Sequence, residues 1–231
     1  MSLYAVINGD IIGSTKLTEK KREFYLIQLK KVFENIKQKK KELGVLRSFE
    51  MYRGDSFQGA IDKPEKALKV VLLLRSYSRM TLTNDAKKLK IGITFAHEMV
   101  DLRIAVGIGK VDKLAKKLME SDGDAFHRSG RLIDSMKKHG PGQNLAIDTP
   151  WQDLNEEFAA SWSLIDAIVS RWSPFQAEVV YYSLLGHTQV EIASILKASP
   201  PAVNQRLKAA SWAPIERVLQ YFETIVQNKT N

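Results

Sequence analysis

The sequence of 231 residues contains no cysteine and no long uninterrupted hydrophobic run. The absence of cysteine excludes disulfides, thiolate zinc sites, redox dithiols and thiol nucleophiles. A membrane span needs about 18 or more consecutive apolar residues, and the N-terminus, MSLYAVINGD, lacks the basic stretch that opens a secretory signal. We therefore expect a cytoplasmic protein with no membrane partner, long enough for one large domain or two small ones.

Charge is unevenly distributed along the chain. Residues 1–140 carry 29 Lys and Arg against 17 Asp and Glu, whereas residues 141–231 carry 6 against 9. The densest basic stretch, residues 16–41, has apolar residues at the spacing of an amphipathic helix: Leu26, Leu29, Phe33 and Ile36. Its basic face is either an ordinary solvated surface or one that attracts phosphate-bearing ligands.

Apolar runs and turn residues predict the order β-α-β-β-α-β-α-β over a first domain, residues 1–148. The Asn8-Gly9-Asp10 turn is expected to end the first strand, and Ser14 or Thr15 to cap the basic helix that follows. Pro64 opens the second helix. The strands are predicted at residues 3–7, 46–52, 56–61, 102–108 and 144–147, with 91–97 as a further candidate, and a helix at 123–136. This order favours an α+β sandwich with a mixed or antiparallel sheet and helices on one face.

Residues 149–231 are predicted to form an all-α domain. Helical patterns cover residues 151–158 and 161–172 and continue from Pro174 onward. The last of them, residues 214–226, places its apolar residues on one side. It is most simply a packing helix or a dimer helix.

Two aspartates flanked by glycine are candidate metal ligands. Asp10 follows the first predicted strand and Asp55 lies at a hairpin turn, so neighbouring central strands would bring both carboxylates to one edge of the sheet. Mg²⁺ binds one or two carboxylates together with phosphate oxygens. The backbone amides of Gly13, Ser14 and Thr15, at the start of the next helix, would then face the phosphates of a nucleotide. In the plainer interpretation both aspartates are turn residues.

Four segments resemble, in the same order, the motifs of class III nucleotidyl cyclases: NGDIIGST, RGDSF, LRIAVGIG and GDAFHRSGRL. The whole chain also resembles the SatD family of bacterial proteins. The cyclase resemblance implies a ferredoxin-like or cyclase-like sandwich in which Asp10 and Asp55 bind Mg²⁺ or Mn²⁺. It further implies a backbone carbonyl ligand from Ile11, stabilisation of phosphate charge by Arg131, and a site shared between the two chains of a homodimer.

The chain departs from the cyclase pattern where a base is selected. The lysine that reads the purine falls on Met51, the asparagine that orients the ribose falls on His127, and the second base-reading position falls on Glu120. His127 is either an acid/base group or a structural histidine, and Arg131 could instead pair with an aspartate of its own helix. The pattern implies a changed substrate, or a former enzyme kept as a nucleotide sensor or scaffold.

Residues 173–210 carry a helix-turn-helix pattern. Ser173, Thr188 and Ser199 are predicted helix caps, and Gly186 ends the first helix. The segment resembles the region 4 type of sigma factors. By that resemblance the third helix enters the major groove of DNA, with Pro201, Asn204, Gln205 and Lys208 reaching the bases and Lys197 and Arg206 near phosphates. The net negative charge of this half leaves open a module that binds protein or only packs on the first domain.

Taken together, these patterns predict a DNA-binding regulator with a nucleotide- or metal-sensing cyclase-like domain. The alternative is a divalent-metal-dependent nucleotidyl cyclase or another phosphoryl-transfer enzyme. A second alternative is a protein-interaction scaffold.

Overall fold

The computed structural model describes residues 2–52, 54–88, 100–138 and 142–231. Within these ranges a five-stranded mixed sheet has the order β2-β3-β1-β4-β5, in which β4 and β5 are parallel and the other neighbours are antiparallel. The strands are β1 (Tyr4–Ile11), β2 (Val45–Tyr52), β3 (Ser56–Ile61), β4 (Leu102–Gly109) and β5 (Leu145–Asp148). The predicted element order is confirmed, while the further strand expected at 91–97 lies outside the described residues.

Helices follow the strands in the predicted order. Those of the strand-containing half are α1 (Glu19–Gln38), α2 (Lys40–Leu43), α3 (Ala67–Lys88) and α4 (Asp124–Lys138), with short 3₁₀ helices η1 (Ser14–Lys16), η2 (Pro64–Lys66) and η4 (Leu118–Glu120). The others are α5 (Gln152–Val169), α6 (Pro174–Leu184), α7 (Gln189–Leu196), α8 (Pro200–Ala209) and α9 (Trp212–Thr230). The prediction of two helices at 151–158 and 161–172 was wrong, because Phe158, Trp162 and Ile165 form one buried stripe along a continuous α5.

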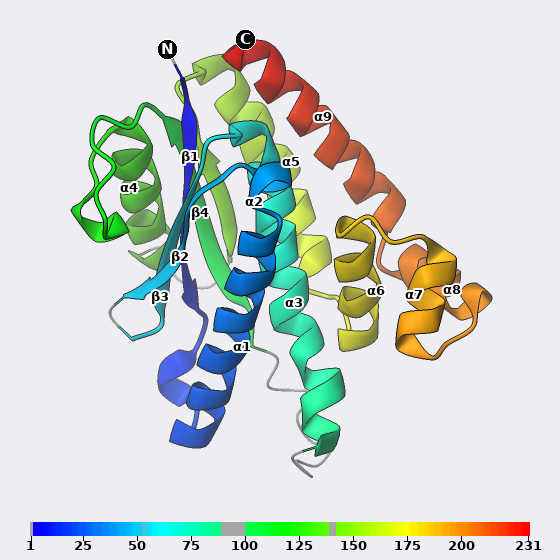
Figure 1. The fold of residues 1–231 in the computed structure, drawn as a ribbon. Coiled ribbons are helices and arrows are strands. Elements are labelled where there is room, and N and C mark those ends of the chain that lie inside the picture. The colour runs from blue at the N-terminus through cyan, green and yellow to red at the C-terminus, as the bar shows by residue number, and fades with distance from the viewer. Residues whose placement is uncertain (1, 53, 89–99, 139–141) are drawn as a thin grey trace.

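Helices cover both faces of the sheet, which corrects the expectation of one covered face (Figure 1). Alternate residues of β1 point to opposite sides. Ile7 joins the main core beneath α1 and α3, whereas Val6 packs with Ala125 and Phe126 of α4. The sheet is therefore a layer between α4 on one side and α1 with α3 on the other.

The first strand does not stop at Asn8-Gly9-Asp10 as predicted. It continues to Ile11, pairing with β4 along its whole length and with β3 from Ala5 to Asp10. A Cβ on Gly9 would lie 2.3 Å from Cζ of Phe57, so this glycine makes room for an aromatic ring and does not form a turn. Asp10 is consequently a residue of the central strand.

Helix α4 lies unusually close to β4. A Cβ on Gly107 would lie 2.3 Å from the carbonyl oxygen of Ala125 and 2.5 Å from the amide nitrogen of Ser129. Arg128 then ties the helix to the next strand, because its guanidinium donates to Asp124, Asp148 and the carbonyl oxygen of Thr149. This contact fixes the residues of α4 that face the sheet.

The C-terminal helices pack directly on the strand-containing half. Helix α6 lies against α3, and Nδ2 of Asn35 in α1 donates to the hydroxyl of Tyr181 at 2.9 Å. Helix α9 is a packing helix, since Phe222 contacts the rings of Phe158 and Trp162. One cluster of buried apolar residues runs from β1 to α9. In the described part of the chain, no helix is sufficiently long and apolar to span a membrane.

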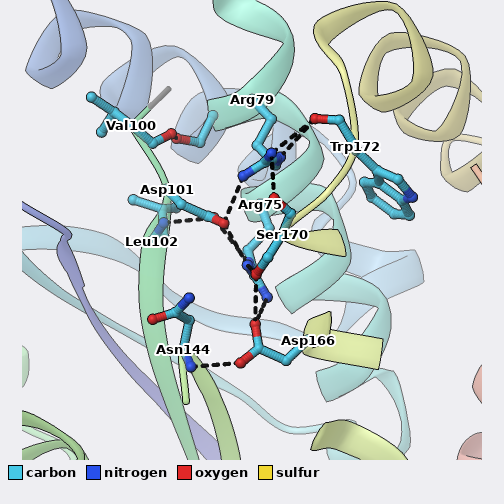
Figure 2. A network of polar contacts seen from close by, with 10 residues as sticks. Arg75, Arg79, Val100, Asp101, Leu102, Asn144, Asp166, Ser170 and Trp172 are labelled. Carbon is cyan, nitrogen blue, oxygen red and sulfur yellow. Dashed lines mark hydrogen bonds and ion pairs between the residues drawn. The ribbon is translucent and has the colours of Figure 1, made fainter. Parts of the chain in front are cut away.

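A buried ionic network joins the sheet to α5 (Figure 2). Arg75 of α3 donates to Asp101, which precedes β4, and at 2.6 Å to Asp166 of α5. Arg79 donates to Asp101 at 2.8 Å and to the carbonyl oxygens of Ser170 and Trp172. These bonds hold three elements in one arrangement, although nothing in the sequence analysis identified them.

Candidate functional site

The structure brings Asp10 and Asp55 to the same edge of the sheet. Asp10 lies opposite Ser56 in the antiparallel pairing of β1 with β3, and Asp55 precedes Ser56 at the hairpin turn. This register explains why the two aspartates lie near each other at that edge. Asp10 is 6% exposed and Asp55 is half-buried, so both remain at the margin of the core.

Two cations hold the carboxylate of Asp10. Nζ of Lys137, from the last turn of α4, lies 3.0 Å from Oδ2, and the guanidinium of Arg103 in β4 lies 3.5 Å from Oδ1. Burying a carboxylate without such partners would be costly. With Asp55, the two carboxylates and two cations leave the cluster without net charge. Sequence reasoning missed both cations; a single arginine within the apolar strand LRIAVGIG was a signal for Arg103, and nothing pointed to Lys137.

Asp55 accepts a hydrogen bond from the segment that follows β1. Ser14 is buried in η1, and its hydroxyl donates a hydrogen bond to Oδ2 of Asp55. Gly13 precedes it in the left-handed region with φ 70°, and Thr15 is exposed. The turn thus joins the hairpin to the end of β1.

Ser14 and Thr15 do not cap the basic helix, which corrects the prediction. Helix α1 begins at Glu19 after Thr18, and η1 intervenes. Thr18 occupies the capping position without a side-chain hydrogen bond. Gly13, Ser14 and Thr15 therefore lie at the short η1 and not at the start of the long helix, and their contact with phosphates stays a prediction. Ile11, the proposed carbonyl ligand, ends β1 with its side chain in the core.

The remaining cyclase-like residues lie on the surface around α4. His127 is exposed and lies 2.9 Å from Asp122. Arg131 is exposed and donates to the carbonyl oxygen of His127, while Asp124 pairs with Arg128 instead. Glu120 is exposed in η4. Among the described residues, His127, Arg131 and Glu120 form no hydrogen bond or ion pair with Asp10 or Asp55 of the same chain.

Met51 packs on the opposite side of the sheet from Asp10. In the pairing of β2 with β3 it lies opposite Phe57, and both residues contact the main core. A methionine in this place has no strong hydrogen-bond donor. Met51 therefore cannot read a base edge by donating a hydrogen bond.

The three predicted helices of residues 173–210 begin where their caps were placed. Ser173 and Thr188 each form a capping box, and Ser199 accepts from the amide of Ala202. Lys197 ends α7 in the left-handed region with φ 51°. Val203 and Leu207 are buried.

The residues predicted to meet DNA form the outward side of α8 and its preceding turn. The exposed members are Lys197, Pro201, Asn204, Gln205 and Lys208. Arg206 is half-buried, with its guanidinium 5.1 Å from the ring centroid of Phe175. This position holds the arginine against α6.

Comparisons with known proteins give a family and a set of similar structures. The model of the SatD family matches residues 4–219. No curated protein matches the chain. Among solved structures, the active GGEEF domain of a diguanylate cyclase from Vibrio cholerae is 14% identical, with 65% of this chain and 85% of that chain covered and a TM-score of 0.40.

Two further similar structures are also cyclases. A bacterial light-regulated adenylyl cyclase is 15% identical, with 63% and 75% of the chains covered and a TM-score of 0.37. The catalytic core of a rhodopsin-guanylyl cyclase with converted specificity, in complex with ATPαS, is 17% identical, with 58% and 72% covered and a TM-score of 0.37. At this level of similarity, function has to be argued from the residues of the chain.

Proposed function

The chain belongs to the SatD family, and we propose that its sheet half binds a nucleotide with a divalent metal ion at Asp10 and Asp55 and acts there in phosphoryl transfer. The observation that carries the proposal is the cluster of two carboxylates and two cations at one sheet edge. Such a cluster offers oxygen ligands to a metal ion and positive groups to phosphates.

The residues present fit Mg²⁺ or Mn²⁺. Both metal ions bind carboxylate oxygens, and Mg²⁺ typically uses one or two carboxylates together with phosphate oxygens. Asp10 and Asp55 would hold the ion, with the backbone of Ile11 as a third candidate. A bound ion would neutralise developing charge and polarise a phosphoryl oxygen. Lys137 is 41% exposed, so its ammonium can leave Asp10 for a phosphate oxygen without losing contact with water.

Arg131 and His127 fit the site of a second copy better than their own. Both side chains are exposed on α4, and in the described residues neither forms a hydrogen bond or ion pair with the aspartates of the same chain. A homodimer that places these two side chains opposite Asp10 and Asp55 would add positive charge next to the phosphates of a bound nucleotide. This arrangement agrees with the resemblance of GDAFHRSGRL to the cyclase helix. The strand order is proposed to be a ferredoxin-like variant of the cyclase sandwich.

Turnover assays test the enzymatic proposal. The protein is incubated with each of the four nucleoside triphosphates and Mn²⁺ or Mg²⁺, and products are separated by chromatography. We expect product from one nucleotide, and loss of at least about a hundredfold in rate for Asp55→Asn. Mixing Asp55→Asn with Arg131→Ala should restore part of the activity if the site is shared between copies. Equal rates for wild type and Asp55→Asn would exclude catalysis by this site.

A second candidate function is DNA binding by α6, α7 and α8. The observation that favours it is the exposed set of polar and basic side chains on α8 above a buried Val203 and Leu207. In helix-turn-helix modules such a face reads base edges, while neighbouring cations contact phosphates. The nucleotide site would then act as a sensor for a regulator.

Fluorescence anisotropy with a genomic fragment library at low salt tests this second function. We expect binding whose logarithmic salt slope falls by about 1 in Lys208→Gln. Lys229→Gln, at the end of α9, is the matched control and should leave the slope unchanged. An absence of binding at low salt, with and without nucleotide, would remove DNA as a partner and favour the scaffold interpretation.

A further inference from the structure

The basic helix α1 begins beside the hairpin that carries Asp55. Arg22 lies in the first turn of this helix, and a Cβ on Gly54 would lie only 2.7 Å from Nη2 of Arg22. Gly54 has φ 82° and precedes Asp55 in the turn between β2 and β3. The guanidinium of Arg22 therefore lies against the backbone of the turn, in the space that a side chain at Gly54 would fill.

Arg22 has no partner of its own in the described part of the chain. Its side chain is exposed and forms no hydrogen bond or ion pair with the described residues. By contrast, the two cations of the aspartate cluster, Arg103 and Lys137, both face the carboxylate of Asp10. A phosphate that binds these two cations competes with a carboxylate, whereas the N–H donors of Arg22 are open to a ligand.

Cations reach this end of the sheet from both of its faces. Arg103 and Lys137 lie on the side of α4, where they hold Asp10. Arg22 comes from α1, which covers the opposite face of the sheet (Figure 1). Asp55 follows the glycine against which Arg22 lies, so the unpaired cation is next to one of the two proposed metal ligands.

A guanidinium at this place suits a polyphosphate. Its planar set of N–H groups can donate to two phosphate oxygens at once. A nucleoside triphosphate stays negative after one divalent ion has bound, and the two carboxylates and two cations of the aspartate cluster have no net charge to offset it. Arg22 adds a positive charge from the same chain, without a second copy.

We propose that Arg22 binds the phosphates of the nucleotide, so that the N-terminal end of α1 forms part of the ligand site. The inference rests on the proposed metal and nucleotide site and adds to it a phosphate contact from the same chain. It also assigns the attraction of phosphate to this end of the basic helix. Gly54 is needed for the contact, because a side chain there would displace the guanidinium.

Calorimetric titration of wild type, Arg22→Gln and Arg22→Lys with Mn²⁺ alone, and with Mn²⁺ and inorganic triphosphate, tests the inference. We expect Arg22→Gln to bind triphosphate about tenfold more weakly, and Arg22→Lys to keep part of the affinity because the charge remains. Mn²⁺ alone should bind both variants at least as well as wild type, whereas a structural role of Arg22 that positions Asp55 would weaken it. Lys30→Gln, an exposed position further along α1, is the matched control and should bind triphosphate like wild type.

Gly54→Ala displaces the same guanidinium without removing its charge. We expect weaker binding of triphosphate in Gly54→Ala, and no further loss when Gly54→Ala is added to Arg22→Gln. Gly186→Ala is the control for backbone strain, because Gly186 has φ 89° and open space around its Cβ position. This control should unfold at a lower temperature and keep the affinity for triphosphate.

Asp55→Asn separates this inference from the proposed function. Equal triphosphate binding by wild type and Arg22→Gln overturns the inference, while loss of that binding in Asp55→Asn still supports the metal site. Weaker binding in Arg22→Gln with unchanged binding in Asp55→Asn supports the phosphate contact and contradicts the metal site. No binding of inorganic triphosphate or of any of the four nucleoside triphosphates to wild type overturns both. Equal losses from Gly54→Ala with and without Arg22 would assign the ligand to the turn and likewise overturn the inference.

Discussion

Arg75 is fully buried and is neutralised from two sides. Burial by itself would lower the pKa of its guanidinium, but the charges and hydrogen bonds of Asp101 and Asp166 outweigh burial and raise that pKa. Three elements meet at this side chain, namely α3, the start of β4 and α5. A buried ion pair contributes modestly as a pair, whereas removing one member leaves an uncompensated charge.

Replacing Arg75 by methionine is therefore expected to destabilise the protein by about 3–5 kcal/mol, because two buried carboxylates lose their common partner. Urea unfolding followed by circular dichroism measures the change. Arg171→Met, at an exposed position, is the matched control with a shift within about 0.5 kcal/mol. A loss below about 1 kcal/mol for Arg75→Met would show that the network does not hold the elements together.

The same network predicts acid sensitivity. Burial would raise the pKa of Asp101, but Arg75, Arg79 and the amide of Leu102 together hold it below its ordinary value of 3.8. Because the folded pKa is the lower one, Asp101 adds stability above the pKa of the unfolded chain, and this stability is lost as the pH falls through 3.8 toward the folded pKa. Unfolding free energies between about pH 5 and pH 2 should fall less steeply in Asp101→Asn than in wild type. Parallel slopes would contradict the assignment.

In the proposed metal site, Lys137 and the metal ion would compete for Asp10. Its Nζ lies 3.0 Å from Oδ2. Removing the ammonium in Lys137→Met should strengthen binding of Mn²⁺ alone by about tenfold, measured by electron paramagnetic resonance of free Mn²⁺. Lys138→Met, the exposed neighbour, should leave binding unchanged. Unchanged or weaker Mn²⁺ binding in Lys137→Met would argue against metal binding at Asp10.

At the scale of elements, α4 positions most of the site. It supplies Lys137 to Asp10 and Ser129 to Asn8, and with β1 and β3 it lines a hollow of about 290 Å³. Its height above the sheet is set by Gly107, where backbone atoms of the helix leave no space for a methyl group. A change in that height moves all three contacts together.

Gly107→Ala is expected to destabilise the protein by about 1–3 kcal/mol, because backbone and not a flexible side chain must shift. Gly130→Ala in α4 itself has open space around its Cβ and should stabilise by about 0.5–1 kcal/mol through helix propensity. Chemical unfolding of both variants gives the comparison. A neutral Gly107→Ala would mean that α4 tolerates a different distance from the sheet.

Local signals predicted some elements well and others badly. The capped helices α6, α7 and α8 follow from Ser173, Thr188 and Ser199, since capping depends on residues close in sequence. By contrast, Asn8-Gly9-Asp10 has the composition of a turn but forms a strand, because Phe57 fills the space above Gly9 and Ser129 bonds Asn8. Partners from distant segments decided that case. Contacts between distant segments also place Arg103 and Lys137 beside Asp10. The aspartates were therefore predictable from the sequence, and the cations that pair with Asp10 were not.

At the scale of the whole molecule, the sheet half and the helical half share a core. The predicted element order is sufficient to place Asp10 and Asp55 near each other, because a hairpin beside a central strand has few arrangements. The sequence order does not fix how α6 packs on α3 or how α9 covers α5, since these contacts join segments far apart in the chain. The end of β1 and helix α8 are therefore connected through packed elements.

Thermal unfolding with Mn²⁺ and each of the four nucleoside triphosphates, for wild type and Asp55→Asn, tests the metal and nucleotide site most directly, because a ligand of the folded state raises stability by mass action. Asp62→Asn, at the other end of β3, is the exposed control. We predict a metal-dependent rise in unfolding temperature with one nucleotide in wild type and Asp62→Asn, and its loss in Asp55→Asn. The same rise in all three proteins, or no rise with any nucleotide, would contradict the account and leave the two aspartates as structural residues.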